Sequence, residues 1–141
     1  MNKNCSSDYG DNPYALNIQC AAIHNNNYRT SIWTGKHLQA TLMSIPVSGD
    51  IGLECHPDTD QFFHVEQGMG LVKMGDIKEN LNFLQKVFNG YAIFIPAGTW
   101  HNILNIGNIP LKLYSIYSPP RHPFCTIQRA KKDAMYLINI I

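Results

Sequence analysis

The segment over residues 49–68 carries several side chains that could bind a divalent metal ion. Glu54 and His56 are two positions apart, so in an extended strand both side chains point to the same face. A turn over residues 57–60 would bring Gln61 back beside His56. Such a hairpin would place a carboxylate, an imidazole and an amide oxygen on one inner surface.

A second segment, residues 90–105, offers another histidine in a defined setting. Pro96 and Gly98 favour a tight turn, and His101 begins the strand that is expected after it. A histidine at the start of a strand, directly after such a turn, is well placed to face into a barrel.

These side chains need a β-sheet scaffold, and the sequence predicts one. Short runs rich in β-branched and aromatic residues alternate with turn signals along most of the chain. Many short strands at even spacing are typical of an antiparallel sandwich or barrel. The expected strands cover residues 29–34, 37–46, 50–56, 61–67, 70–75, 82–88, 91–95, 100–105 and 110–118.

The two ends of the chain differ in composition from the predicted sheet. Residues 1–13 are rich in Asn, Ser, Asp and Gly and are expected to form a flexible tail, which leaves residues 14–141 as one domain. The barrel core covers about residues 29–118. Residues 119–125 are rich in proline and should cross the outside as a strap. Beyond Thr126 the apolar spacing predicts a short amphipathic C-terminal helix.

The second segment resembles a motif of the cupin superfamily, G-x5-P-x-G-x2-H-x3-N. It matches at all of the fixed positions, which are Gly90, Pro96, Gly98, His101 and Asn105. The wider run over residues 29–123 is similar to small single-domain bacterial cupins, some of them labelled mannose-6-phosphate isomerase-like. This resemblance implies an all-β fold, an antiparallel jelly-roll barrel of about eight to ten strands.

The first segment resembles the other cupin motif, G-x5-H-x-H-x3-4-E-x6-G, but departs from it. Gly49 is one residue too close, and Glu54 stands where the first histidine is usual. His56 matches the second histidine, Gln61 replaces the usual glutamate, and Gly68 falls in the expected place. These departures put the ligand set of the motif in question, although the fold is unaffected.

The resemblance implies a single divalent metal ion held by four side chains, Glu54, His56, Gln61 and His101. A mixed nitrogen and oxygen set without thiolate suits octahedral Mn(II) first and Fe(II) next, while Ni, Co and Zn remain alternatives. Asp58 and Asp60, in the intervening turn, are the substitute carboxylates. His64 is out of phase with Gln61 and is expected to face away from the metal.

Two classes of function fit this reading. In the first, the protein is a metalloenzyme in which the ion acts as a Lewis acid or redox centre on a small oxygenated substrate, as in isomerases and oxygenases. In the alternative, it is a non-catalytic module that binds a metal or a small molecule. A general base is not evident; Tyr114, Tyr117 and His37 are open choices.

Composition limits the classes of binding partner and the cellular location that we expect for this protein. The 141 residues are 45% hydrophobic and 15% charged, with a formal net charge of +1, so no basic stripe points to nucleic acid. No apolar run is long enough to span a membrane. The four cysteines are widely spaced and predicted to be unpaired, in a cytoplasmic protein. Apolar segments at 14–23 and 134–141 predict a homodimer.

Overall fold

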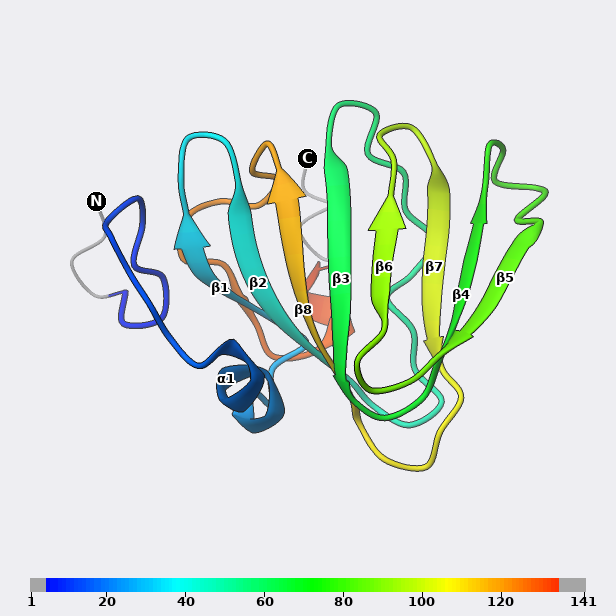
Figure 1. The fold of residues 1–141 in the computed structure, drawn as a ribbon, viewed down its shortest axis with the longest axis horizontal. Helices are drawn as coiled ribbons and strands as arrows, with labels where there is room; N and C mark the ends of the chain where they lie inside the picture. The colour runs from blue at the N-terminus through cyan, green and yellow to red at the C-terminus, as the bar shows by residue number, and fades with distance from the viewer. Residues whose placement is uncertain (1–4, 135–141) are drawn as a thin grey trace.

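The computed structural model describes residues 5–134, and strands dominate it (Figure 1). The first helix is α1 (Ile18–His24). The strands are β1 (Arg29–Thr34), β2 (Gln39–Ile45), β3 (Asp60–Gln67), β4 (Gly70–Gly75), β5 (Phe83–Val87), β6 (Ala92–Ile95), β7 (Trp100–Asn105), β8 (Leu111–Ser118) and β9 (Ile127–Gln128).

These strands form two antiparallel sheets. One sheet has six strands in the order β6-β3-β8-β2-β1-β9, and the other has three in the order β5-β4-β7. Because neighbours such as β3 and β8 are far apart in sequence, the chain crosses repeatedly between positions in the sheets. The predicted all-β architecture is confirmed.

One predicted strand is wrong. Residues 50–56 form only isolated bridges to β7, at Asp50 and at Glu54. Gly52, between these bridges, has φ +87°, a left-handed conformation that interrupts an extended strand. The prediction also missed the two-residue strand β9, which pairs with the start of β1.

The core lies between the two sheets and follows the expected alternation along each strand. Val65 lies opposite Leu113, and Leu113 lies opposite Met43, so three neighbouring strands direct apolar side chains to one inner face. The opposing sheet supplies Val72 and Ile103 to the same buried cluster. This packing aligns the inner faces that position the functional residues.

The inner face of the larger sheet becomes polar towards one end. Gln61 lies opposite Tyr117, and Tyr117 lies opposite Gln39, in a row across β3, β8 and β2. All three side chains are buried. Buried polar side chains are costly unless something satisfies them, so this end of the barrel is a candidate for a bound group.

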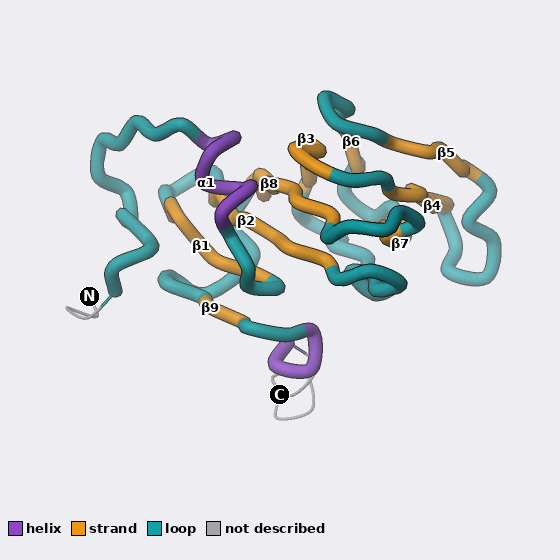
Figure 2. The backbone as a smooth tube through the Cα atoms, turned by 90° about the horizontal axis from the view of Figure 1, so that it is seen from below, coloured by secondary structure: helices purple, strands orange, loops and turns teal. Residues whose placement is uncertain are grey.

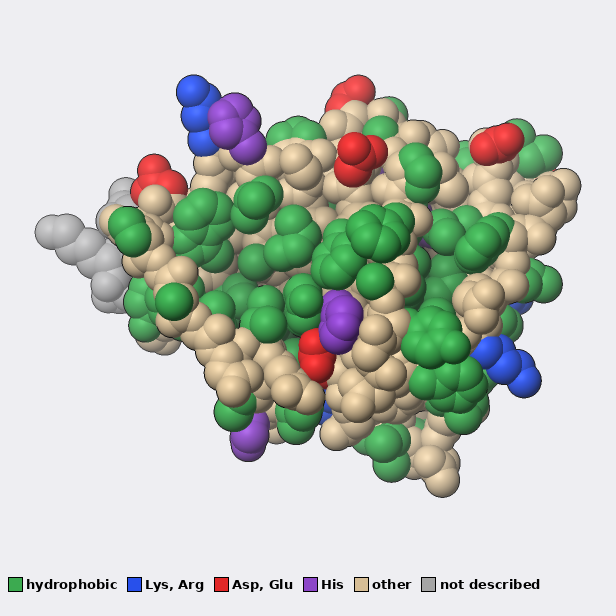
Figure 3. Space-filling model, in the orientation of Figure 1, with side chains coloured by type: hydrophobic (Ala, Val, Ile, Leu, Met, Phe, Trp, Pro, Cys, Tyr) green, Lys and Arg blue, Asp and Glu red, His purple; other side chains and the backbone are tan. Residues whose placement is uncertain are grey.

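The outer face of the larger sheet is only partly covered. Helix α1 begins at Asn17, whose side chain accepts a hydrogen bond from the Cys20 amide, and it packs Ala22 against β2 and β8. Beyond the helix the face is open, and Figure 3 shows hydrophobic side chains gathered there. Phe94 on β6 is 70% exposed.

Residues 5–13, which were predicted to lie in a flexible tail, make bonds to the rest of the fold. The Asp8 carboxylate accepts hydrogen bonds from the hydroxyls of Ser31 (2.6 Å) and Thr34 (2.7 Å). A disulfide joins Cys5 to Cys125, so the prediction of four unpaired thiols is wrong for these two. The composition suggested disorder, but one buried carboxylate and one covalent bond hold the segment.

Replacing Asp8 by asparagine should destabilise the protein by about 1.5–3 kcal/mol at neutral pH, the range for hydrogen bonds to a charged group. Burial raises the pKa of Asp8, but the hydrogen bonds from Ser31 and Thr34 outweigh it, so the folded-state pKa lies below its ordinary value. A lowered pKa stabilises the fold above the unfolded-state pKa and loses this effect as pH falls through the folded-state value.

Urea unfolding at pH 7 and at about pH 3 measures this effect. The difference between wild type and Asp8→Asn should be full at pH 7 and smaller at the acid end. Asp11→Asn, at an exposed position of the same segment, is the control and should change stability little. A difference that stays constant with pH would contradict the assignment.

The end of the described chain passes to the side of the sheet away from α1 (Figure 2). Residues 131–134 are helical, which confirms the start of the predicted C-terminal helix; the rest of it lies outside the described residues. In residues 5–134 no helix combines the length and the hydropathy needed to cross a membrane.

Candidate metal centre

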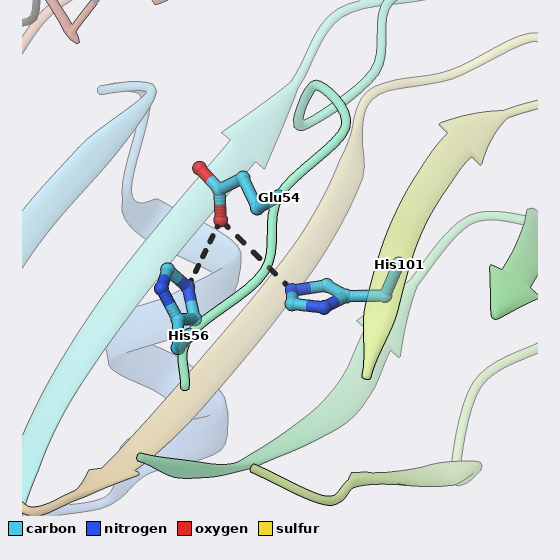
Figure 4. A group of neighbouring side chains, drawn as sticks. All are labelled: Glu54, His56 and His101. Atoms are coloured by element: carbon cyan, nitrogen blue, oxygen red, sulfur yellow. Dashed lines mark ion pairs between the residues drawn. The ribbon is translucent and has the colours of Figure 1, made fainter. Parts of the chain in front are cut away.

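Glu54, His56 and His101 meet at the polar end of the barrel interior (Figure 4). Oε2 of Glu54 lies 3.3 Å from Nε2 of His56 and 4.0 Å from Nε2 of His101. One ligand atom from each residue lies within 4.8 Å of the others. Two segments almost fifty residues apart in sequence therefore supply one cluster.

Backbone hydrogen bonds hold these two segments together. The amide of Glu54 donates to the carbonyl of His101, and the amide of His101 donates back to the carbonyl of Glu54, both at 2.9 Å. The Gly98 amide donates to the His56 carbonyl, also at 2.9 Å. The turn before β7 thus sets the position of His56, while the bridge sets Glu54 against His101.

The His101 ring is oriented for ligation through Nε2. Its Nδ1 lies 2.9 Å from the carbonyl oxygen of Thr99, which makes Nδ1 the protonated nitrogen and leaves the Nε2 lone pair free. Burial lowers the pKa of His101, so the ring is neutral at physiological pH. Neutral imidazole is the form that binds metal ions.

Glu54 provides a negative charge at the same point. Burial raises its pKa, but the contact with His56 and the nearby guanidinium of Arg29 outweigh burial, and the resulting pKa is below the ordinary value. The side chain is 28% exposed. A cavity of about 270 Å³ reaches Glu54 from the surface, and Tyr28 and Lys131 contribute to its lining.

The unsatisfied atoms of the cluster test whether a metal ion fits. Nε2 of His101 and both ring nitrogens of His56 are buried without a hydrogen-bond partner. Ligand atoms about 2.1 Å from one ion lie about 3 Å apart when adjacent and about 4.2 Å apart when opposite. The observed separations of 3.3 and 4.0 Å fall in this range, so the three residues fit a metal ion.

Gln61, the fourth predicted ligand, lies on the same inner face. Its Nε2 donates to Oγ of Ser115 at 3.0 Å, while its Oε1 is buried without a partner. The oxygen is therefore the free end of the amide, as a metal ligand requires. Its place in the ligand set stays a prediction.

The substitute carboxylates do not join the cluster. Asp58 and Asp60 are exposed, and Oδ1 of Asp60 accepts a hydrogen bond from the Ala97 amide at 2.8 Å. His64 faces the outside, as expected: its Nδ1 lies 2.6 Å from Oε1 of Glu66, and its ring stacks on Tyr114. Among the described acidic residues, Glu54 is the carboxylate that the fold brings to the two histidines.

The structure adds residues that sequence reasoning did not select. Arg29 is buried beside Glu54, with Nη2 4.0 Å from Oε1. His122, from the proline-rich strap, packs edge-on against Tyr117, and burial lowers its pKa to about 3. The one signal for Arg29 was its place at the start of a predicted strand, where a charge can fall on the buried face.

Of the open choices for a general base, the fold brings Tyr117 closest to the cluster. Its ring centroid is 6.0 Å from that of His56, and its side chain is fully buried. Tyr114 lies on the outer face beside His64, and His37 is exposed in the turn between β1 and β2.

Comparison with known proteins agrees with this geometry. The family model for the Cupin domain matches residues 41–117. The uncharacterized protein YrkC of Bacillus subtilis is 57% identical over 128 residues, which cover 91% of this chain and 69% of that protein. The crystal structure of BH2720 from Bacillus halodurans has a TM-score of 0.92 and 55% identity, with 92% and 98% of the two chains covered.

A more distant structure shows how widely the fold extends. KdgF from Halomonas sp. is 19% identical with a TM-score of 0.59, and the match covers 66% of this chain and 80% of that one. At this identity the likeness concerns the fold alone.

Proposed function

Since the chain belongs to the cupin family, we propose that it is a metal-dependent protein whose ion is bound by Glu54, His56 and His101. Gln61 completes the proposed ligand set through its free Oε1. The observation that carries this proposal is the convergence of unpartnered histidine nitrogens on one carboxylate. Leaving such buried nitrogens unsatisfied costs stability, and a bound cation removes the cost.

The proposed ion is Mn(II), with Fe(II) next. Two imidazoles, one carboxylate and one amide oxygen form a mixed set that suits octahedral ions with open coordination positions. Ni, Co and Zn are the alternatives, since the same donors bind them as well. In this set Glu54 carries the charge that offsets the cation, and Thr99 fixes the orientation of the His101 ring.

The proposed activity is that of a small-molecule enzyme of the isomerase or oxygenase type. A bound ion would supply Lewis-acid or redox chemistry to an oxygenated substrate. The chain's own residues would do the rest. The barrel wall excludes bulk water around the buried His101, and the cavity beside Glu54 would give a small molecule access to this carboxylate from the surface.

Elemental analysis of the purified protein, combined with thermal melting, tests the proposal. We expect one divalent ion per chain, lost on dialysis against a chelator. Adding back Mn at a hundredfold excess over its Kd should stabilise the fold by about 2.7 kcal/mol and raise the melting temperature by several degrees. Substoichiometric metal together with no thermal shift for Mn, Fe, Co, Ni or Zn would contradict it.

The enzymatic part has its own test. Metal-loaded protein is incubated with small hydroxy acids, keto acids and sugars, and the products are followed by NMR. Conversion that stops after chelation supports an enzyme. Ligands that bind the loaded protein and are recovered unchanged would instead favour the non-catalytic binding module.

A cytoplasmic homodimer is the assembly that we propose. Tyr14, Leu16 and Ile23 lie on or beside α1 and remain exposed, which favours this segment as part of the interface. The other predicted segment, 134–141, lies almost entirely outside the described residues. Light scattering at micromolar concentration measures the mass directly, and a monomer would refute the proposal.

A further inference from the structure

The inner wall beside the candidate metal centre contains unsatisfied polar atoms that the metal ligands do not account for. Arg29 is 2% exposed and its Nε has no hydrogen-bond partner. Tyr117 is fully buried and its hydroxyl has none either. Thr41 adds a third unsatisfied atom, its hydroxyl oxygen, on the neighbouring strand. Native proteins rarely bury several such groups together unless a bound molecule or ordered water satisfies them.

Arg29 and Tyr117 lie on the same side of the metal cluster. Nη2 of Arg29 is 4.0 Å from Oε1 of Glu54, and the ring of Tyr117 is 6.0 Å from that of His56. The Tyr117 hydroxyl lies close enough to the Arg29 guanidinium to interact with it. The inner wall therefore presents a phenol donor beside a guanidinium.

A purely structural role explains Arg29 in part and Tyr117 poorly. Nη1 of Arg29 donates to Oε1 of Gln128 at 2.6 Å, which ties β9 to β1, and its charge lies near Glu54. A phenylalanine would fill the space of Tyr117 without burying an unpaired hydroxyl. The unpaired buried hydroxyl therefore destabilises the fold, and a ligand that forms a hydrogen bond with it would remove this cost.

The charges of the interior indicate what kind of ligand this is. Once a divalent cation is bound, it and Arg29 together outweigh the single negative charge of Glu54. An excess of buried positive charge is unfavourable unless an anion neutralises it. Guanidinium also matches carboxylate geometry, because its parallel N–H groups can donate to both oxygens.

We infer that Arg29 and Tyr117 bind the carboxylate of a small oxygenated acid, held beside the proposed metal centre. This inference rests on the proposed function, because a bound ion would supply the excess positive charge. An α-hydroxy or α-keto acid fits best, since it has a second oxygen next to the carboxylate.

Tyr117→Phe is the variant that isolates this role. The change removes one oxygen that has no hydrogen-bond partner in the protein, so the melting temperature and the Mn affinity should stay near the wild-type values. Glycolate, lactate and pyruvate are titrated calorimetrically into Mn-loaded protein, with glycolamide as the uncharged counterpart of glycolate. We expect glycolate to bind at least tenfold more tightly than glycolamide.

Loss of the Tyr117 hydroxyl should weaken glycolate binding about tenfold, which corresponds to about 1.4 kcal/mol. Arg29→Lys keeps the positive charge but removes the two parallel N–H donors of the guanidinium, so it should weaken glycolate binding further. Tyr91→Phe is the control: its ring is 42% exposed beside Phe88 and away from the metal cluster, so this variant should melt and bind glycolate like the wild type.

The results separate this inference from the proposed function. Wild-type affinity for glycolate in both Tyr117→Phe and Arg29→Lys, with metal bound, would overturn the inference and leave the metal site standing. Equal affinity for glycolate and glycolamide, or no binding of any of the three acids, would overturn it as well. If the wild type binds no metal, the proposed function fails. Glycolate is then titrated into metal-free protein, which tests the Arg29–Tyr117 pair alone. Glycolate binding that depends on Tyr117 would support the role of this pair, and absence of such binding would refute it.

Discussion

His101→Ala should purify almost free of metal, with a loss of affinity of more than about a hundredfold. Changing only the outer partners of a metal ligand costs 10- to 100-fold, and this variant removes the ligand itself. His101 is the fully buried ligand whose free Nε2 points at Glu54 (Figure 4). Metal content is measured after dialysis against a chelator of moderate strength.

The other ligands should follow a definite order in the same measurement. His56→Ala should lose its metal like His101→Ala, because imidazoles give the larger share of the affinity. Glu54→Gln should weaken binding strongly, since it removes the charge that offsets the cation. Gln61→Ala should weaken it least, and Gln61→Glu should tighten it by adding a second carboxylate.

His64→Ala is the matched control for these variants. His64 lies on β3, as Gln61 does, but its ring faces outward and contacts Glu66 and Tyr114. This variant should keep its metal. If His101→Ala keeps full metal, the site is elsewhere; if Glu54→Gln does, the site functions without this carboxylate.

Phe63→Ala should lower the free energy of unfolding by about 3–5 kcal/mol, a large part of the stability of a typical domain. Phe63 is fully buried on the inner face of β3, between the two sheets. Its removal loses the transfer free energy of the ring and leaves a cavity that the rigid strands can close only in part. Urea unfolding with an unchanged m-value measures the effect.

Phe94→Ala supplies the comparison, because the same substitution is made on the neighbouring strand β6 at a side chain that is 70% exposed. Its effect should stay within about 0.5 kcal/mol, as for most surface changes. Similar losses in the two variants would mean that the inner and outer faces of β3 and β6 are assigned wrongly. That result would also place Gln61 on the outer face, because Gln61 and Phe63 are two residues apart on β3 and point to the same side of the sheet.

Most strands, and the face of the sheet to which each of their side chains points, follow from the local sequence pattern. Alternation is a local property: Phe63 and Val65 are apolar and two apart, so they must share the buried face, and Gln61 shares it with them. The Pro96–Gly98 turn placed His101 at the head of β7 for the same kind of local reason. His56 and His101 could therefore be predicted as candidate ligands before any contact was known.

The way in which distant segments meet could be seen only in the folded protein. Residues 50–56 look like a strand, but the left-handed Gly52 leaves two bridges, and the pairing of Glu54 with His101 gives the cluster its geometry. Local composition also suggested a free tail where Asp8 is held by Ser31. In each case the deciding partner is a long way off in the sequence.

The same dependence on distant segments explains why the sequence did not predict the surroundings of the buried Arg29 guanidinium. Alternation could place Arg29 on an inner face, but it could not name Gln128 or Tyr117 as its neighbours, because these come from β9 and β8 at the other end of the chain. The cost of burying a charge depends on the surrounding groups and not on the residue alone. The ligand donors follow from local spacing, whereas the charge and the unsatisfied hydroxyl beside them arise only when the sheet closes.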